Sequence, residues 1–107
     1  MPEWIAACDV DDVEREDVIP FQHDGADYAI YRSPDDQFFA TAGRCTHGRT
    51  LLCDGLVMGD IIECPKHNGR FDYKTGQAKG APIIVDLPTY PVKVDHGTVY
   101  VGFGTVG

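Results

Sequence analysis

The sequence is most constrained by two short cysteine–histidine pairs, Cys45-Thr46-His47 and Cys64-Pro65-Lys66-His67, with 16 residues between His47 and Cys64. Each pair places one sulfur and one nitrogen ligand on a short loop that glycine bounds, so the backbone can turn tightly there. Two such loops together make a site with four ligands for a transition metal. The amino end lacks the basic and apolar parts of an export signal, so the cysteines are expected to be metal ligands or free thiols rather than disulfides.

The order of the four ligands distinguishes between metals. A zinc finger of the common kind groups a cysteine pair and a histidine pair, whereas here cysteine and histidine alternate along the chain. Alternation suits a site with two metals, in which both cysteines bind one iron and both histidines bind the other, as in a Rieske 2Fe-2S centre. A structural zinc ion is the alternative.

The segments Cys45-Thr46-His47-Gly48 and Cys64–Phe71 resemble the two cluster-binding loops of the Rieske family. Segments 76–82 and 90–94 are similar to that family as well, so the likeness covers nearly all of the chain beyond Asp27. The resemblance implies one Rieske-type 2Fe-2S cluster. It assigns Cys45 and Cys64 to a buried iron, and His47 and His67 to an outer iron whose imidazole edges face the surface. It also implies that Thr46 packs or hydrogen-bonds beside these loops.

Four positions depart from the Rieske proteins of respiratory complexes. Thr50 and Lys66 stand where those proteins carry two cysteines that form a disulfide, so that bridge is absent here. Gly69 and Phe71 stand where they carry serine and tyrosine hydroxyls near the cluster. Without these donors the reduced, more negative cluster is less stabilised. We therefore expect a potential toward the lower end of the Rieske range of roughly −150 to +300 mV.

The pattern of short apolar segments and turns predicts an all-β fold. The resemblance implies that this fold is a Rieske-type antiparallel β-sandwich with an inserted small cluster-binding subdomain of two loops. The expected strands are 18–22, 27–32, 37–41, 61–64, 70–73, 92–94 and 98–101, with turns at 24–25, 33–36 and 95–97. The 107 residues are expected to form a single domain. Residues 1–41 and 83–107 are its basal scaffold, and the glycine-dense residues 42–82 are the cluster-binding insertion.

The formal net charge is −8, and seven acidic residues lie in the first 17 positions with a single base, Arg15. No basic stripe is present to replace the counterions of nucleic acid, so nucleic acid is excluded as a partner. No apolar segment reaches the length of a membrane span. A cytoplasmic protein is expected.

The acidic segment Asp9–Asp17 is interpreted as a solvated helical turn or loop, with an acidic docking face for a basic partner as the alternative.

The remaining cysteines and histidines lie outside the ligand pattern. Cys8 and Cys53 are interpreted as small buried or half-buried thiols, and His23 and His96 as exposed turn residues. Four bases lie near the two loops: Arg44, Arg49, Lys66 and Arg70. They either solvate exposed loops or guide the docking of a partner.

The chain offers no second active centre, because a ring-hydroxylating oxygenase needs a further iron held by two histidines and a carboxylate on a much larger domain. The resemblance therefore implies a one-electron carrier rather than an enzyme. Its partners are a flavin-dependent, NAD(P)H-dependent ferredoxin reductase and a terminal Rieske non-haem iron oxygenase of aromatic hydrocarbon catabolism, and the carrier is expected to be a monomer. The alternatives are a small Rieske subunit of a stable complex, such as nitrite reductase, and a zinc-stapled interaction module.

Overall fold

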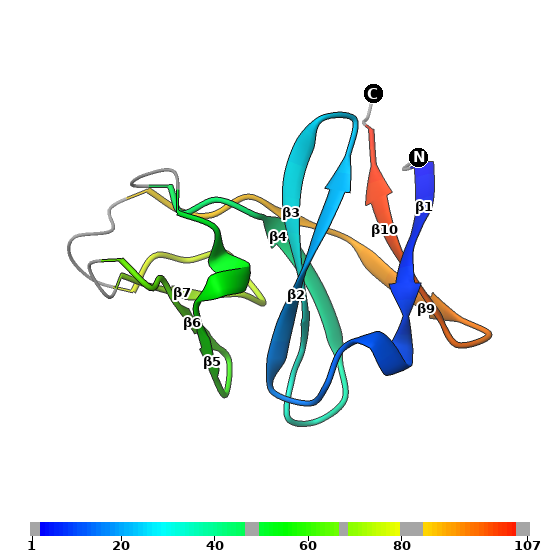
Figure 1. The fold of residues 1–107 in the computed structure, drawn as a ribbon, viewed down its shortest axis with the longest axis horizontal. Helices are drawn as coiled ribbons and strands as arrows, with labels where there is room; N and C mark the ends of the chain where they lie inside the picture. The colour runs from blue at the N-terminus through cyan, green and yellow to red at the C-terminus, as the bar shows by residue number, and fades with distance from the viewer. Residues whose placement is uncertain (1–2, 47–49, 67–68, 80–84, 105–107) are drawn as a thin grey trace.

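The computed structural model describes residues 3–46, 50–66, 69–79 and 85–104. Within these ranges the secondary structure consists of strands and two 3-10 turns, η1 (Val10–Asp12) and η2 (Leu52–Asp54). The strands form three antiparallel sheets that follow one another along the longest axis of the molecule (Figure 1). The all-β prediction is confirmed.

Each sheet joins strands that are close in space but not always in sequence. The first sheet has the order β1 (Glu3–Asp9), β10 (Thr98–Phe103) and β9 (Val92–Asp95). The second sheet has the order β2 (Asp17–His23), β3 (Ala26–Arg32), β4 (Phe38–Ala42) and β8 (Thr89–Tyr90). The third sheet has the order β5 (Leu56–Met58), β6 (Ile61–Glu63) and β7 (Arg70–Asp72).

The tight turns follow the turn residues of the sequence. In the β2–β3 hairpin both Asp24 and Gly25 have positive φ, 50° and 79°, and in the β9–β10 hairpin His96 and Gly97 have 50° and 78°. Two consecutive residues with positive φ define the turn whose twist matches that of paired strands. The predicted turns at these positions are confirmed.

The second sheet is the middle layer of the molecule and is covered on both faces. Alternate residues of β3 point to opposite sides, so Ile30 joins one apolar cluster while Ala29 and Tyr31 join another. The cluster toward the first sheet is formed by Val13, Ile30, Ala40, Val99 and Val101. The cluster toward the third sheet includes Leu52, Val57, Ile62, Phe71, Tyr73 and both motif cysteines. The middle layer therefore positions the site through its own core.

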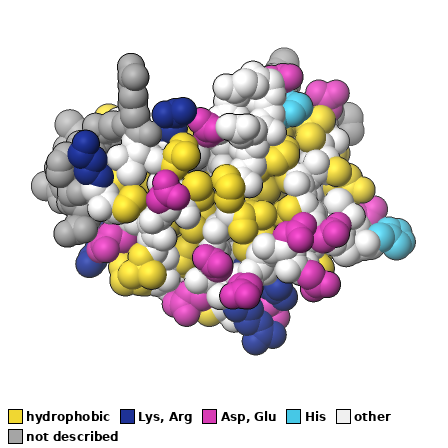
Figure 2. Space-filling model, in the orientation of Figure 1, with side chains coloured by type: hydrophobic (Ala, Val, Ile, Leu, Met, Phe, Trp, Pro, Cys, Tyr) yellow, Lys and Arg dark blue, Asp and Glu magenta, His cyan; other side chains and the backbone are white. Residues whose placement is uncertain are grey.

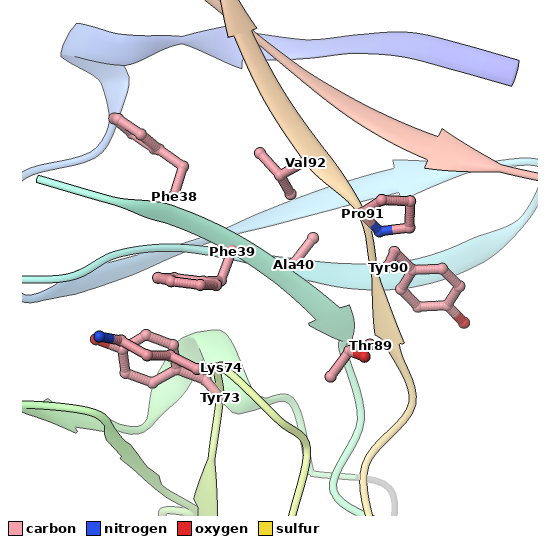
Figure 3. A pocket seen from close by; sticks show the side chains of 9 residues that line it. All are labelled: Phe38, Phe39, Ala40, Tyr73, Lys74, Thr89, Tyr90, Pro91 and Val92. Carbon is pink, nitrogen blue, oxygen red and sulfur yellow. The ribbon is translucent and has the colours of Figure 1, made fainter. Parts of the chain in front are cut away.

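A cavity of about 350 Å³ lies over β4 of the middle layer, between the residues that follow β7 and the chain that runs from β8 into β9 (Figure 3). It is lined by Phe38, Phe39, Ala40, Tyr73, Lys74, Thr89, Tyr90, Pro91 and Val92. The Lys74 ammonium lies 5.3 Å from the centroid of the Phe39 ring, and the Tyr73 ring lies 5.7 Å from the same ring. The lining contains no Cys, His, Asp or Glu, so it offers none of the usual ligands for iron or zinc.

The acidic segment is helical over η1 alone, where the backbone N–H of Asp9 donates to Asp12 Oδ2 at 2.9 Å. The prediction of a helical turn or loop is confirmed, except that Val13 is fully buried in the core facing the first sheet.

The prediction that His96 is an exposed turn residue is confirmed, because its side chain is exposed in a turn. The prediction for His23 is wrong, because His23 ends β2 and its ring stacks on Phe103 at 4.7 Å. No helix among the described residues is long and apolar enough to cross a bilayer.

Candidate metal centre

Two cysteines from the motifs lie in one apolar cluster between the middle layer and the third sheet. Cys45 follows β4 after two residues, and Cys64 follows β6 directly. Both side chains are almost completely buried, and neither forms a disulfide. The prediction that Cys45 and Cys64 converge on the same part of the molecule is therefore consistent with their placement. His47 and His67 lie outside the described residues.

The two cysteines begin loops that are closed in the same way. The backbone N–H of Cys45 donates to Thr50 O at 2.9 Å, and that of Cys64 donates to Gly69 O at 2.7 Å. Immediately outside each bond the chain is paired antiparallel, Arg44 with Leu51 and Glu63 with Arg70. Each loop thus starts at a cysteine and is closed by the residue five positions later. A repeated closure of this kind fixes both cysteines on rigid β structure.

An ion pair stabilises the base of each loop. Arg44 donates to Asp27 Oδ2 at 2.7 Å, and the backbone N–H of Gly43 donates to Asp27 O at 2.8 Å. The hydrogen bond from Gln22, together with Arg44, holds the pKa of the Asp27 carboxyl below its usual range. In the second loop Arg70 donates to Glu63 Oε2 at 2.9 Å. The first loop is therefore anchored to β3, and the second is closed within its own hairpin.

A third segment of the chain lies against the first loop. The Thr46 hydroxyl donates to Val85 O at 2.8 Å, although 39 positions separate the two residues. Farther along, the backbone N–H of Leu87 donates to Gly76 O at 2.7 Å. The expectation that Thr46 packs or hydrogen-bonds beside the loops is confirmed. Residues 85–87 thereby hold the returning chain beside the site.

Gly55 allows η2 to approach the second loop closely. A β-carbon at this position would lie 2.2 Å from Glu63 O and 3.2 Å from Pro65 Cδ, closer than a side chain permits. The neighbouring Leu52 is fully buried in the cluster that contains both cysteines. A glycine here therefore lets apolar side chains surround the thiols without a gap.

The positions that depart from the respiratory proteins fit the expected differences. Thr50 and Lys66 occupy the positions of that bridge, and the four cysteines of the chain are free thiols. Gly69 is buried and Phe71 is fully buried in the cluster of the two cysteines. Neither side chain carries a hydroxyl that could donate to a sulfur. The site is consequently more apolar than in the proteins with serine and tyrosine there.

Cys8 and Cys53 are half-buried, as predicted. Burial raises the pKa of the Cys8 thiol to about 11, with smaller contributions from the nearby carboxylates of Asp12 and Asp9. Burial also raises the pKa of the Cys53 thiol. Both residues are thus half-buried thiols outside the two cysteine–histidine motifs.

The described part of the site fits a sulfur-ligated cluster. Two buried cysteines share one apolar cluster, and thiolates are the ligands that hold iron–sulfur clusters. No group of three or more His, Cys, Asp and Glu residues suited to a metal ion occurs among the described residues, which include neither motif histidine. Asp27, Glu63 and Val85 were not predicted as part of the site. A cross-strand pair beside Cys64 could have suggested Glu63, but no local pattern indicates Asp27 or Val85.

The model of the Rieske 2Fe-2S domain family matches residues 3–91. The chain belongs to this family, and its cofactor is one 2Fe-2S cluster rather than a zinc ion. It is 41% identical, over 87% of this chain and 88% of the relative, to the ferredoxin component of the naphthalene 1,2-dioxygenase/salicylate 5-hydroxylase systems of Ralstonia sp..

Two solved structures are similar over most of their length. The ferredoxin of Sphingomonas yanoikuyae B1 is 35% identical with a TM-score of 0.88, covering 95% of this chain and all of the other. The ferredoxin in a complex with the reduced oxygenase of carbazole 1,9a-dioxygenase is 39% identical with a TM-score of 0.87, covering 92% of each chain. The chain is accordingly a ferredoxin-type electron carrier and not a catalytic subunit.

Proposed function

We propose that this protein carries one electron at a time from a flavin-dependent NAD(P)H reductase to the terminal oxygenase of a ring-hydroxylating dioxygenase system. The support is the combination of a buried cysteine pair with relatives that are ferredoxin components of such systems. One similar ferredoxin has been solved in complex with its oxygenase. The single observation that carries the proposal is the placement of Cys45 and Cys64 in one apolar cluster at the start of two equally closed loops.

The four motif residues are the proposed ligands. Cys45 and Cys64 would bind the inner iron, and His47 and His67 the outer iron. When bound, the cluster accepts and releases one electron at a potential that nitrogen ligation raises above that of an all-cysteine cluster. The chain's own contribution is to surround the cysteines with apolar side chains such as Leu52 and Phe71, and to close both loops by backbone hydrogen bonds.

The division of the chain follows the sheets. We propose that residues 1–41 and 83–107 form the basal scaffold and that residues 42–82 form the cluster-binding insertion of a single domain. The described strands of the first sheet fall in the scaffold, and those of the third sheet fall in the insertion. We also propose a cytoplasmic location and a monomer in solution, because a carrier that serves two partners must exchange freely between them.

The first test concerns the cluster. Anaerobically purified protein is expected to contain iron and inorganic sulfide in equal amounts and to give a paramagnetic resonance signal when reduced. Replacing one imidazole by a thiolate in His67→Cys should lower the potential or destroy the cluster, whereas His96→Gln, in an exposed turn, should leave spectrum and potential unchanged. An unchanged potential in His67→Cys would remove this residue from the ligand set.

The second test concerns the partners. Purified reductase and oxygenase from candidate systems are mixed with NADH and an aromatic substrate, with and without this protein. Product formation should depend on the concentration of the carrier and vanish without it. If the reduced cluster forms normally but no oxygenase accepts its electron, the partner assignment fails while the cluster assignment stands.

A further inference from the structure

Charge is distributed very unevenly between the two parts of the chain. Residues 42–82 contain six Lys and Arg against four Asp and Glu, a net charge of +2. The rest of the chain contains three Lys and Arg against thirteen Asp and Glu, a net charge of −10. Although the whole protein has a net charge of −8, the segment 42–82 with both cysteine–histidine motifs has a positive net charge.

The fold places most of these two parts at opposite ends, but Asp27 and Asp86 of the remainder lie beside the two loops and offset the net charge of +2 there. The third sheet and the described residues of the two loops lie at one end of the longest axis, and the first sheet lies at the other end (Figure 1). In the same view, Lys and Arg side chains lie at the left end and at the lower edge, and Asp and Glu lie beside them at the left as well as over the right and lower parts (Figure 2). The longest extent of the molecule is 38 Å. This exceeds the screening length of about 10 Å at 0.1 M salt, so a partner at one end senses mainly the local charge.

At the loops, the ion pairs present their cationic member to solvent. The Arg44 side chain is 54% exposed and its partner Asp27 only 17%. The Arg70 side chain is 55% exposed and its partner Glu63 only 21%. Both carboxylates lie beneath their guanidinium groups, so the outer surface beside each loop is positive although each pair is neutral.

Two further cations at this end are exposed without a carboxylate partner among the described residues. Lys66 lies within the second loop, between Cys64 and His67. Lys79 is held next to Arg70 by its backbone N–H, which donates to Arg70 O, and its ammonium donates to Gln77 Oε1 at 3.2 Å. The exposed acids Asp54 and Asp86 belong to the same end. Here the term loop cations denotes Arg44, Lys66, Arg70 and Lys79.

We infer that the loop cations select an acidic contact face on the partner protein and turn the cluster end toward it, while the acidic remainder of the molecule is repelled. This inference rests on the proposed electron-carrier function and names the chemistry of the partner's surface. Opposite charges across an interface raise the association rate and suppress wrong orientations. The electron would then leave from the end that faces the partner, because fewer encounters would occur in unproductive orientations.

The test uses a small anionic oxidant in place of a protein partner. Holoprotein reduced under anaerobic conditions is mixed in a stopped-flow instrument with hexacyanoferrate(III), and each cluster passes one electron to one Fe(III), which becomes Fe(II). If the loop cations govern the encounter, the second-order rate constant falls as ionic strength rises from about 0.1 M to about 0.5 M. If the net charge governs it, the rate constant rises over that range, because the two reactants then repel each other.

Two charge reversals of equal size provide the comparison. Lys79→Glu alters the cluster end, and Lys93→Glu alters the opposite end, where Lys93 lies on β9 of the first sheet. Both bring the net charge to −10 from −8. Lys79→Glu should slow the reaction with hexacyanoferrate(III) about fourfold and speed the reaction with cationic tris(phenanthroline)cobalt(III) by a similar factor. Lys93→Glu should change either rate constant by less than about 1.5-fold.

Equal effects of the two reversals, or a rate constant that rises with salt, would overturn the inference. Because Lys93 lies 4.8 Å from the Trp4 ring centroid, its reversal also removes a cation–π contact. Arg15→Glu, on the loop before β2, is a second control with the expectation of a similarly small effect, and it removes the ion pair with Asp36 instead. These measurements need the cluster but no protein partner. Their outcome therefore does not depend on whether the reductase and oxygenase assignment is correct.

Discussion

Gly76 and Gly25 have nearly the same backbone conformation in different surroundings. Their φ values are 81° and 79°, a region that costs a residue with a β-carbon about 1–2 kcal/mol. At Gly25 nothing lies within 4 Å of the position that a β-carbon would take, whereas at Gly76 a β-carbon would lie 2.0 Å from Leu87 O. Gly76 thus permits the close approach by which Leu87 returns to the site.

Gly76→Ala should therefore destabilise the fold by about 1–3 kcal/mol more than Gly25→Ala, because only the first adds a backbone clash to the strained φ. The difference is measured as the shift in the urea midpoint of the two variants relative to wild type. Equal midpoints for the two alanine variants would show that the chain at Leu87 moves aside without cost.

Phe71 offers a direct test of the missing hydroxyl at the cluster. The residue is fully buried beside both cysteines, so a tyrosine hydroxyl placed there must find an acceptor among the sulfurs or nearby backbone. Phe71→Tyr should raise the reduction potential by about 60 mV, the equivalent of a hydrogen bond of about 1.4 kcal/mol that favours the reduced state. Gly69→Ser should act in the same direction. Voltammetry of the holoprotein gives the value.

Phe39→Tyr is the matched control, since Phe39 packs against the same cluster but lines the cavity beside Lys74. Its potential should equal that of wild type. A rise in both variants would attribute the effect to general polarity rather than to a bond at the cluster, and no rise in Phe71→Tyr would remove the hydroxyl argument.

Only site residues that belong to a short sequence motif could be predicted from the sequence. Cys45 and Cys64 could be predicted because a thiol and an imidazole at fixed short spacing are rare outside metal sites. Asp27 is not visible, because its contact with Arg44 exists only once β3 and the chain after β4 lie side by side. His23 shows the same limit: its neighbours in sequence suggest an exposed turn, but Phe103 from the far end of the chain covers its ring.

The loop before β2 and the β5–β6 turn are joined by one side chain. Glu16 adopts a φ of 57°, its backbone N–H donates to Arg32 O at 2.8 Å, and its Oε2 accepts the Gly59 N–H at 2.8 Å. The same turn is held from the other side by Lys74, whose ammonium lies 3.0 Å from Asp60 Oδ1. Glu16 is thus a direct tie between the scaffold and the third sheet.

Glu16→Ala should lower the free energy of unfolding by about 1 kcal/mol, since the Gly59 N–H loses its acceptor. Glu16→Gln keeps an acceptor oxygen and the same backbone strain, and should cost less than half as much. Urea unfolding measures both, and amide exchange at Gly59 should quicken in the alanine variant alone. Identical losses in the two variants would mean that the charge of Glu16, not its hydrogen bond, stabilises the fold.

Among the elements, strands with strong β propensity and a neighbouring turn are the predictable ones, as β3 and β10 illustrate. β1 was missed, because Glu3–Asp9 has no hairpin partner next to it in sequence and pairs instead with β10. The short β5 and β8 were missed as well. Long-range pairing, rather than local preference, decides β1 and β8, whereas β5 pairs with β6 across a two-residue turn.

At the scale of the whole molecule, the two apolar clusters on opposite faces of the middle layer are stabilised by different means. The cluster toward the first sheet is built from aliphatic side chains, most of them on strands that pair over their full length. The cluster toward the third sheet contains two thiols and three-residue strands. With Cys45 and Cys64 as the proposed ligands, the insertion would depend on the bonds from sulfur to iron, whereas the scaffold would not.

Removal of iron should consequently loosen one part of the molecule and not the other. After anaerobic treatment with a chelator, hydrogen exchange followed by mass spectrometry should show peptides with the amides of Cys45 and Cys64 exchanging at least about tenfold faster, because their loop-closing bonds open once the thiols lose their ligand. Peptides from β3 and β10, which contain Ile30 and Val99, should change by less than about twofold. The holoprotein under the same buffer is the control. Equal acceleration in all peptides would mean that the scaffold cannot fold without the cluster, and no acceleration at the cysteines would mean that their loops are held by the protein alone.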